Sequence, residues 1–222
     1  MIRSLVGGAA IVAVGVSCVA GGCSSTTIAI KEKMGIPKRE QLVARVNDAR
    51  DGQQEAKQQF ASALHEFMAV TGASGGDLEA KYDKLRKEYE RSESRAETVH
   101  SRIKDVERVA EALFKEWKAE LAQYSSESMR QASQRELEAT RARYDGLIGA
   151  MRAAAAKMQP VLAAFKDQVL FLKHNLNARA IASLQGNVAQ IQTDVGNLIR
   201  DMESSIAEAN AFIDQMQKGE AK

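Results

Sequence analysis

Apolar and small residues recur every three or four positions over most of the chain, from residue 38 to residue 216. That spacing places them on one face of an α-helix, with polar residues filling the positions between them. Stretches rich in Gly, Ser or Asn interrupt the pattern at residues 71–76, 125–128 and 175–177. Such clusters favour turns. The pattern predicts four long helices, over about residues 38–70, 78–124, 127–175 and 178–216, and no strand of useful length.

The second segment has the most regular pattern. Its apolar steps alternate between four and three residues for more than five heptads, from Leu78 to Tyr124. This is the spacing of a coiled-coil seam, which a neighbouring helix covers. Trp117 stands on the seam, so we expect its ring in the core. In the first segment, Gln53 fills a gap in an otherwise apolar stripe.

The third segment contains Pro160, but its apolar stripe keeps the same phase on both sides of that residue. A proline inside a helix removes one hydrogen bond and bends the axis. We therefore expect a kink near Pro160 and no helix end. Small residues at 146, 149, 150 and 153–156 would let a neighbouring helix approach closely. Asn177 is a suitable N-cap for the fourth helix; the alternative is one continuous helix over residues 127–216.

These elements predict an all-α fold, an elongated antiparallel helical bundle or coiled coil of about four long helices. The bundle domain would cover residues 37–217, and residues 218–222 would form a frayed tail. A seam of five heptads can be covered by another helix of the same chain or by a helix of a second chain. A homo-oligomer is therefore possible, and the oligomeric state stays open.

The segment before the bundle has the features of an export signal. Arg3 precedes a charge-free apolar stretch from Leu5 to Ala20, and small residues lead into Cys23. A positive start, a short apolar stretch and small residues at the cleavage site are typical of a signal peptide. Residues before Cys23 fit the bacterial pattern in which the cysteine receives lipid. The alternatives are modification at Cys18 and a retained membrane helix.

Cleavage before Cys23 would define residues 1–22 as a lipoprotein signal peptide and 23–36 as a lipidated N-terminus and tether. Two or more lipid chains anchor a protein stably in a bilayer. Ser24 is not the aspartate that resembles a retention signal for the inner membrane. We therefore expect a cell-envelope protein anchored in the outer membrane and facing the periplasm, with no free cysteine.

Composition agrees with long helices, because the chain has only two prolines and few aromatic residues. Removal of the signal would leave 30 basic and 29 acidic side chains. A nucleic-acid-binding domain concentrates basic charge on one face. The charges here are interleaved along the sequence, so we expect no nucleic-acid partner.

Four stretches of the chain resemble one family. They are residues 34–40 (MGIPKRE), 45–50 (RVNDAR), 110–117 (AEALFKEW) and 172–180 (LKHNLNARA). Together they are similar to the bacterial domain of unknown function 2959, found in envelope proteins of Gram-negative bacteria. The resemblance extends over essentially all of the chain after the signal. It implies an exported, all-helical domain and supplies no catalytic or binding residues.

The segment before the fourth helix carries the best candidate for a specific site. His174, Asn175, Asn177 and Arg179 place an imidazole, two amides and a cation near a predicted corner. One interpretation is a partner-binding or anion-binding helix end. The other, which we favour, is a set of caps and a buried polar clamp that fixes the corner. The three histidines belong to different predicted helices, and we expect no metal site and no cofactor.

The absence of a phosphate loop or a nucleophile motif from the sequence indicates a non-enzymatic role. The leading hypothesis is a lipid-anchored periplasmic helical protein with a structural, scaffold or protein-interaction role. Its partners would be the membrane, through the lipid anchor, and an envelope protein that the sequence does not identify. The alternatives are a membrane-surface or cell-wall-associated remodelling module and, last, an enzyme with a site between helices.

Overall fold

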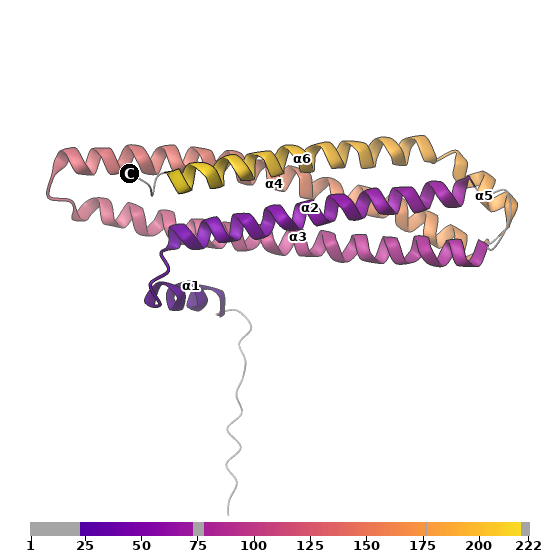
Figure 1. The fold of residues 1–222 in the computed structure, drawn as a ribbon, viewed down its shortest axis with the longest axis horizontal. Coiled ribbons are helices and arrows are strands. Elements are labelled where there is room, and N and C mark those ends of the chain that lie inside the picture. The colour runs from indigo at the N-terminus through magenta and orange to yellow at the C-terminus, as the bar shows by residue number, and fades with distance from the viewer. Residues whose placement is uncertain (1–22, 73–77, 176, 219–222) are drawn as a thin grey trace, which may run out of the picture.

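The computed structural model describes residues 23–72, 78–175 and 177–218 of the chain. Its six α-helices and one short 3-10 helix make up an elongated bundle with a side helix (Figure 1). The elements are α1 (Cys23–Lys33), α2 (Lys38–Thr71), α3 (Leu78–Glu120), η1 (Leu121–Gln123), α4 (Glu127–His174), α5 (Ala178–Gln185) and α6 (Val188–Lys218). The described part contains no strand, so the all-α fold class is confirmed.

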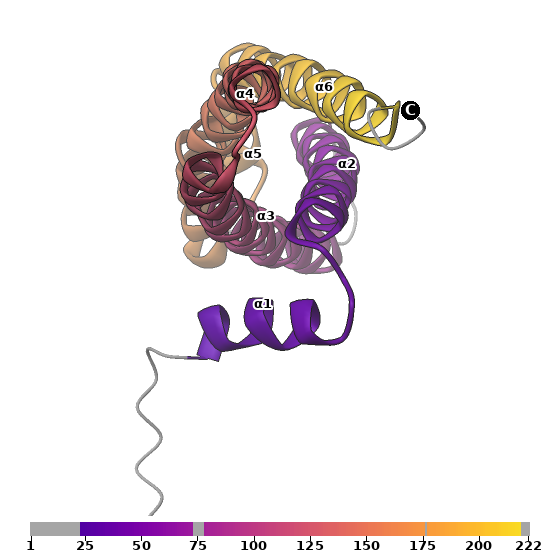
Figure 2. The ribbon, with the colours of Figure 1, turned by 90° about the vertical axis from the view of Figure 1, so that its left-hand side faces the viewer.

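The four long helices α2, α3, α4 and α6 form the body of the bundle. Each packs against two others, in the order α2, α3, α4, α6 and back to α2. Figure 2 shows this ring from its end, and Figure 1 shows that successive long helices run in opposite directions. At 1.5 Å per residue, the 43 residues of α3 span about 65 Å. The predicted antiparallel bundle of about four long helices is confirmed.

The apolar faces of these helices meet in one continuous core. Its largest fully buried side chains come from all four long helices and α5, and include Phe60, Phe67, Leu85, Leu147, Phe165, Leu184, Leu198 and Met202. Burying a side chain of this size stabilises the fold by about 1.5–3 kcal/mol. The Phe67 and Phe165 rings meet edge to face, with their centroids 6.2 Å apart. The three-and-four spacing in the sequence therefore correctly identified the buried stripes.

At least one ion pair crosses each of the four seams of the ring. An exposed pair contributes at most about 1 kcal/mol to stability. Opposite charges at fixed positions along two helices nevertheless favour one register over others. The pairs are Glu55–Arg95, Glu107–Arg152, Lys157–Asp201 and Lys57–Glu203.

The helix ends confirm several sequence predictions. Helix α2 ends at Thr71, where the glycine-rich stretch begins; residues 73–77 of that stretch lie outside the described part. The Ser126 hydroxyl caps α4 by accepting a hydrogen bond from the Met129 backbone N–H. Helix α4 continues through Pro160 to His174, so the proline is not a stop; the bend itself stays a prediction.

The fourth predicted segment is not one helix. It divides into α5 and α6 at a turn formed by Gly186 and Asn187. Glycine is a poor helix former, and the Asn187 amide donates to Gln168 Oε1 of α4 at 3.3 Å. The turn lets α5 cross the end of the bundle before α6 returns along it (Figure 1). The alternative of one helix over residues 127–216 is wrong.

Two further elements differ from the sequence predictions. The segment expected to act as a tether contains the helix α1. Trp117 is half-buried and lies outside the main core. It lies in the last turn of α3, near the end where α3 and α4 project beyond the other long helices (Figure 1). The indole N–H donates to Ser133 Oγ of α4 at 2.9 Å.

Candidate functional site

The junction between α1 and the bundle begins with a tight turn. Gly35 has a φ of +83°, in the left-handed region that glycine adopts at no steric cost. Pro37 follows as the N-cap residue of α2, with φ −58° and ψ 151°. Proline fixes φ near −65° and needs no hydrogen-bond partner for a backbone N–H. The chain therefore changes direction between α1 and α2 within four residues, 34–37.

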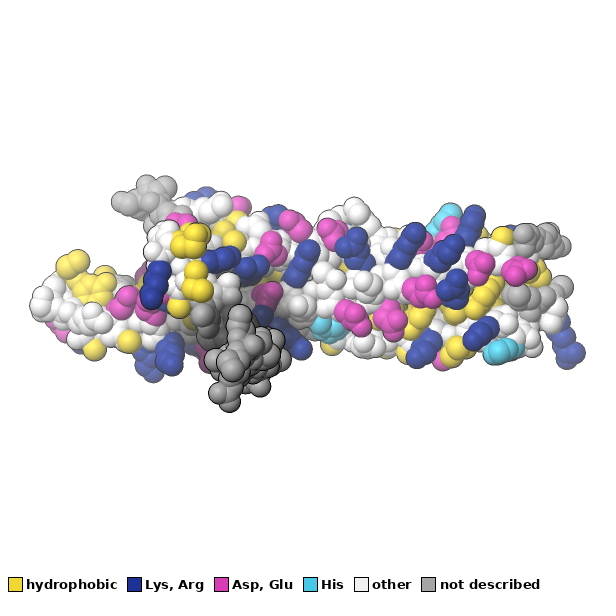
Figure 3. Space-filling view, turned by 90° about the horizontal axis from the view of Figure 1, so that it is seen from below, with side chains coloured by type: hydrophobic (Ala, Val, Ile, Leu, Met, Phe, Trp, Pro, Cys, Tyr) yellow, Lys and Arg dark blue, Asp and Glu magenta, His cyan; other side chains and the backbone are white. Residues whose placement is uncertain are grey.

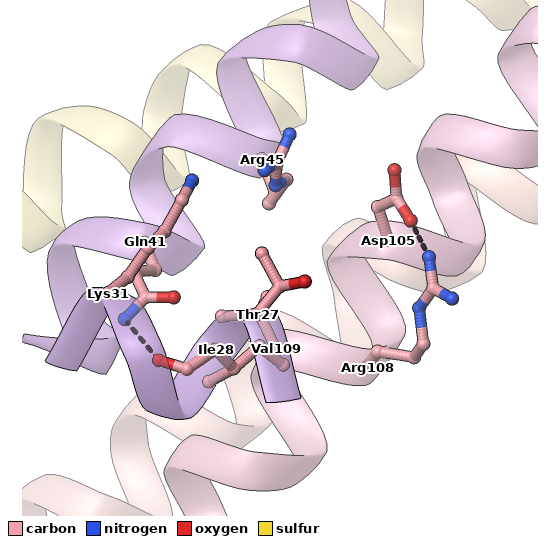
Figure 4. A pocket seen from close by; sticks show the side chains of 8 residues that line it. All are labelled: Thr27, Ile28, Lys31, Gln41, Arg45, Asp105, Arg108 and Val109. Atoms are coloured by element: carbon pink, nitrogen blue, oxygen red, sulfur yellow. Dashed lines mark hydrogen bonds and ion pairs between the residues drawn. The ribbon is translucent and has the colours of Figure 1, made fainter. Parts of the chain in front are cut away.

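A buried amide ties α1 to the first turn of α2. The side chain of Gln41 is only 4% exposed. Its Nε2 donates to the carbonyl oxygens of Ile36, at 2.9 Å, and Ile28, at 3.3 Å. Figure 4 shows the bond to Ile28. Because a buried amide that loses its partners is costly, these two bonds favour one position of α1 against the bundle.

Lys38 adds an ionic link among three helices. Its Nζ contacts Glu32 Oε2 of α1 at 2.5 Å and Glu116 Oε2 of α3 at 2.9 Å. Burial of the ammonium group acts to lower the pKa of Lys38, but the two carboxylates overcome it and raise that pKa. The hydrogen bond from Lys38 in turn lowers the pKa of Glu32. Both groups are thus charged at neutral pH.

A cavity of about 190 Å³ lies between α1, α2 and α3 (Figure 4). Arg108 pairs with Asp105 across one helical turn, and Arg45 pairs with Asp48 at 2.9 Å. Among the side chains that the structure describes, the lining contains no His, Cys or Ser. Its polar groups position α1. The lining residues are Thr27, Ile28, Lys31, Gln41, Arg45, Asp105, Arg108 and Val109.

Cys23, the expected lipidation site, is the first residue of α1. The backbone of this residue is described and its side chain is not, while Cys18 lies outside the described residues. The expected attachment point is thus at one end of the helix that Gln41 and Lys38 hold to the bundle. Neither interaction was apparent from the sequence, because both depend on how α1 folds back beside α2 and α3.

The second candidate site is the corner between α4 and α5. His174 is the last residue of α4, and the Asn175 amide donates to the Phe171 carbonyl at 2.9 Å. Asn177 Oδ1 accepts from the Ala180 backbone N–H at 3.0 Å and caps α5, as predicted. The Asn177 N–H also bonds the Asn175 carbonyl, at 2.9 Å. The two asparagines therefore cap the two helix ends.

The other two predicted residues do not join this arrangement. Within the described residues, neither the His174 imidazole nor the Arg179 guanidinium makes a hydrogen bond or an ion pair. Both side chains are exposed, and so is Asn177. The expectation of a buried clamp is therefore wrong. Caps lie at the ends of helices, where water also reaches the backbone groups.

Residues beyond the predicted four fix the corner to the bundle. Gln185 Nε2 of α5 donates to the Thr71 carbonyl, the last residue of α2, at 3.1 Å. Asn187 reaches Gln168 of α4, and Ile181 and Leu184 are buried in the core. In the sequence only the apolar residues gave a signal, because a glutamine or asparagine in a polar stretch is ordinary.

Removing the Asn177 cap should destabilise the protein. We expect Asn177→Ala to lower the free energy of unfolding by about 1 kcal/mol, because the Ala180 N–H loses its acceptor. Chemical denaturation followed by circular dichroism measures the change. Arg179→Ala is the matched control and should leave stability within about 0.5 kcal/mol of the wild type. Equal losses in the two variants would contradict the capping role.

The described residues contain no group of three or more His, Cys, Asp or Glu side chains that could hold a metal ion. Glu97 and His100 of α3 do have the Glu-x-x-His spacing of di-metal bundles. That motif needs further inward-facing carboxylates, and Glu97 is exposed. Among the helices of the described part, none is long and apolar enough to cross a membrane.

Comparison with known proteins identifies a family but no characterised relative. No curated protein and no solved structure matches the chain. The family model described as protein of unknown function (DUF2959) matches residues 28–216, which include most of α1 and all of α2 to α5. That range covers well over half of the chain and confirms the resemblance found in the sequence. The chain therefore belongs to the DUF2959 family of proteins of unknown function.

Proposed function

We propose that this protein is a lipid-anchored structural or interaction protein of the bacterial cell envelope. Lipid on Cys23 would hold it in the outer membrane, with the bundle in the periplasm. The observation that supports this most is the position of Cys23 at the start of α1. Gln41 and Lys38 hold that helix against α2 and α3. An anchor at Cys23 would thereby set the orientation of the whole bundle.

The shape of the bundle supports a role in spacing or binding other envelope components. Helices of about 50–70 Å, packed round one apolar core, make a stiff rod. A rod that is attached at one point can present a binding surface at a fixed distance from that point. We propose an envelope protein as the partner and a non-enzymatic role. In support, the polar residues around α1 hold that helix against the bundle.

The anchor is tested by metabolic labelling with a palmitate analogue in a Gram-negative host. We expect the wild type and Cys18→Ser to incorporate label and Cys23→Ser to incorporate none, because only a thiol at the cleavage site can receive the lipid. Mass spectrometry of the N-terminal peptide identifies the modified residue. Label that persists in Cys23→Ser and disappears in Cys18→Ser would move the anchor to Cys18.

The membrane assignment is tested by separating inner and outer membranes on a density gradient. The labelled wild type should sediment with the outer membrane. Recovery in the inner membrane would contradict that part of the proposal while leaving the lipid anchor intact. Crosslinking in cells, followed by mass spectrometry, would then identify the partner from the anchored, full-length protein.

A further inference from the structure

Charge is distributed unevenly over the two helices that form the α4–α6 seam. The C-terminal part of α4 together with α5, residues 146–187, carries five basic side chains and one acidic side chain, Asp167. Helix α6 has the opposite balance, with five acidic residues and two basic ones. The interleaving seen over the whole sequence therefore does not hold here. The basic residues are Arg152, Lys157, Lys166, Lys173 and Arg179.

The excess positive charge gathers at the end of the bundle where α4 stops. Arg152 and Lys157 pair with Glu107 and Asp201 on the adjoining helices. Lys166, Lys173 and Arg179 are exposed and have no ion pair with any described residue. We call these three residues, together with Leu170 and Phe171, the distal patch.

Apolar side chains lie exposed among these cations. Leu170 is 49% exposed and Phe171 is 40% exposed, so both belong to the eight large apolar residues that are exposed in the described part of the chain. Figure 3 shows apolar side chains at the end of the bundle remote from α1, beside Lys and Arg and also beside Asp and Glu. Exposed apolar residues with basic neighbours are typical of helices that lie at a lipid–water interface. Long lysine side chains let the charge reach the headgroups while their stems contact apolar groups.

The outer face of α4 continues this surface toward the middle of the bundle with very little side-chain bulk. Positions 146, 149, 153, 156 and 163 are exposed Gly or Ala, spaced so that they share one face of the helix. A Cβ added to Gly146 or Gly149 would meet no atom within 4 Å. Packing within the chain thus does not require these glycines, although each costs a helix about 1 kcal/mol. A flat surface can approach such a face closely.

We propose that the distal patch docks on the surface of a bilayer that contains anionic lipids. Charge complementarity favours this occupant, because Lys166, Lys173 and Arg179 have no ion pair among the described residues and an anionic surface would supply the missing charge. A parallel pair of α4 helices from two copies would instead bring the same cations together. The N-terminal turn of α1 and the C-terminal half of α4 also lie on the same side of the bundle (Figure 2). A lipid on Cys23 and the distal patch can thus reach one plane. The inference rests on the proposed anchor only for the choice of membrane.

The test uses the full chain with Cys18→Ser and Cys23→Ser, which carries no cysteine and can receive no lipid. Its partitioning is measured on vesicles of phosphatidylcholine alone and on vesicles that also contain about 40% phosphatidylglycerol, which gives them a negative surface charge. Each basic residue near an anionic surface strengthens binding about five-fold. Lys166→Glu with Lys173→Glu should therefore reduce partitioning at least about 25-fold on the anionic vesicles.

The matched control reverses two exposed cations at the opposite end of the bundle, Lys118→Glu with Arg135→Glu. It changes the net charge equally and should leave partitioning within about two-fold of the parent. Circular dichroism confirms that the variants fold. Equal losses in the two double variants, or no loss in either, would overturn the proposal.

A spin label reports which face meets the lipid. On the same background, nitroxides are attached at Ala163→Cys on α4 and at Ala211→Cys on α6, both exposed positions. On anionic vesicles we expect the label at 163 to be more accessible to oxygen than to a water-soluble nickel complex, and the label at 211 to show the reverse. Aqueous accessibility at both positions, or spin–spin broadening at 163 that indicates a second copy, would overturn it. Loss of palmitate labelling at Cys23 would contradict the anchor alone.

Discussion

Phe165→Ala should lower the free energy of unfolding by about 3–5 kcal/mol. The Phe165 side chain is fully buried, and its ring meets Phe67 of α2 edge to face, with centroids 6.2 Å apart. The substitution removes the transfer free energy of the ring and leaves a cavity that the surrounding helices can only partly fill. It also removes an aromatic contact that contributes about 0.5–1.5 kcal/mol beyond its buried area.

Equilibrium denaturation in urea, followed by circular dichroism, measures this loss. Phe171→Ala is the matched control, because it makes the same truncation six residues later in α4 at a side chain that is 40% exposed. We expect that variant to lose less than about 1.5 kcal/mol, since its ring leaves little new cavity. Similar losses at the two positions would show that Phe165 does not occupy the core as described.

The second large effect concerns a polar contact inside the core. Ser205 Oγ of α6 donates to Gln53 Oε1 of α2 at 2.8 Å, and both side chains are fully buried. Gln53 Nε2 is also buried and has no hydrogen-bond partner among the described residues. Ser205→Ala should therefore lower the free energy of unfolding by about 1–3 kcal/mol, because it leaves the carbonyl end of the Gln53 amide unpaired as well.

Gln53→Met together with Ser205→Ala should leave the free energy of unfolding unchanged or raise it. Replacing both polar groups by apolar groups of similar shape is nearly neutral or stabilising. We therefore expect the double variant to be at least as stable as the wild type. The pair is measured as a double-mutant cycle by urea denaturation, with Gln53→Met alone as the fourth member. Additive losses in the double variant would mean that the two side chains do not interact.

Local signals along the chain predicted the helices well. Apolar steps of three and four residues gave the buried faces of α2, α3, α4 and α6, and Asn177 gave the N-cap of α5. Both kinds of signal depend on residues a few positions apart, whose relation the helix itself fixes. The turn at Gly186 was missed because Ile181 and Leu184 keep the helical spacing up to it.

The candidate sites were less predictable than the helices. The sequence placed His174 and Arg179 with the two asparagines, but only the asparagines act as caps. It gave no sign that Gln41 and Lys38 would hold α1, since their partners lie on other elements. Trp117 was expected in the core, and whether a seam residue is covered depends on how far the neighbouring helices extend.

What the sequence determined by itself is therefore the all-α fold, the approximate number and length of the helices, and the family. It also indicated Cys23 as the attachment point, which palmitate labelling can test. The tertiary structure alone decided the position of α1, the pairing of Gln53 with Ser205, and the distal patch of exposed cations and apolar residues. Helix periodicity is local, whereas these features join residues far apart in the chain, and only packing brings them together.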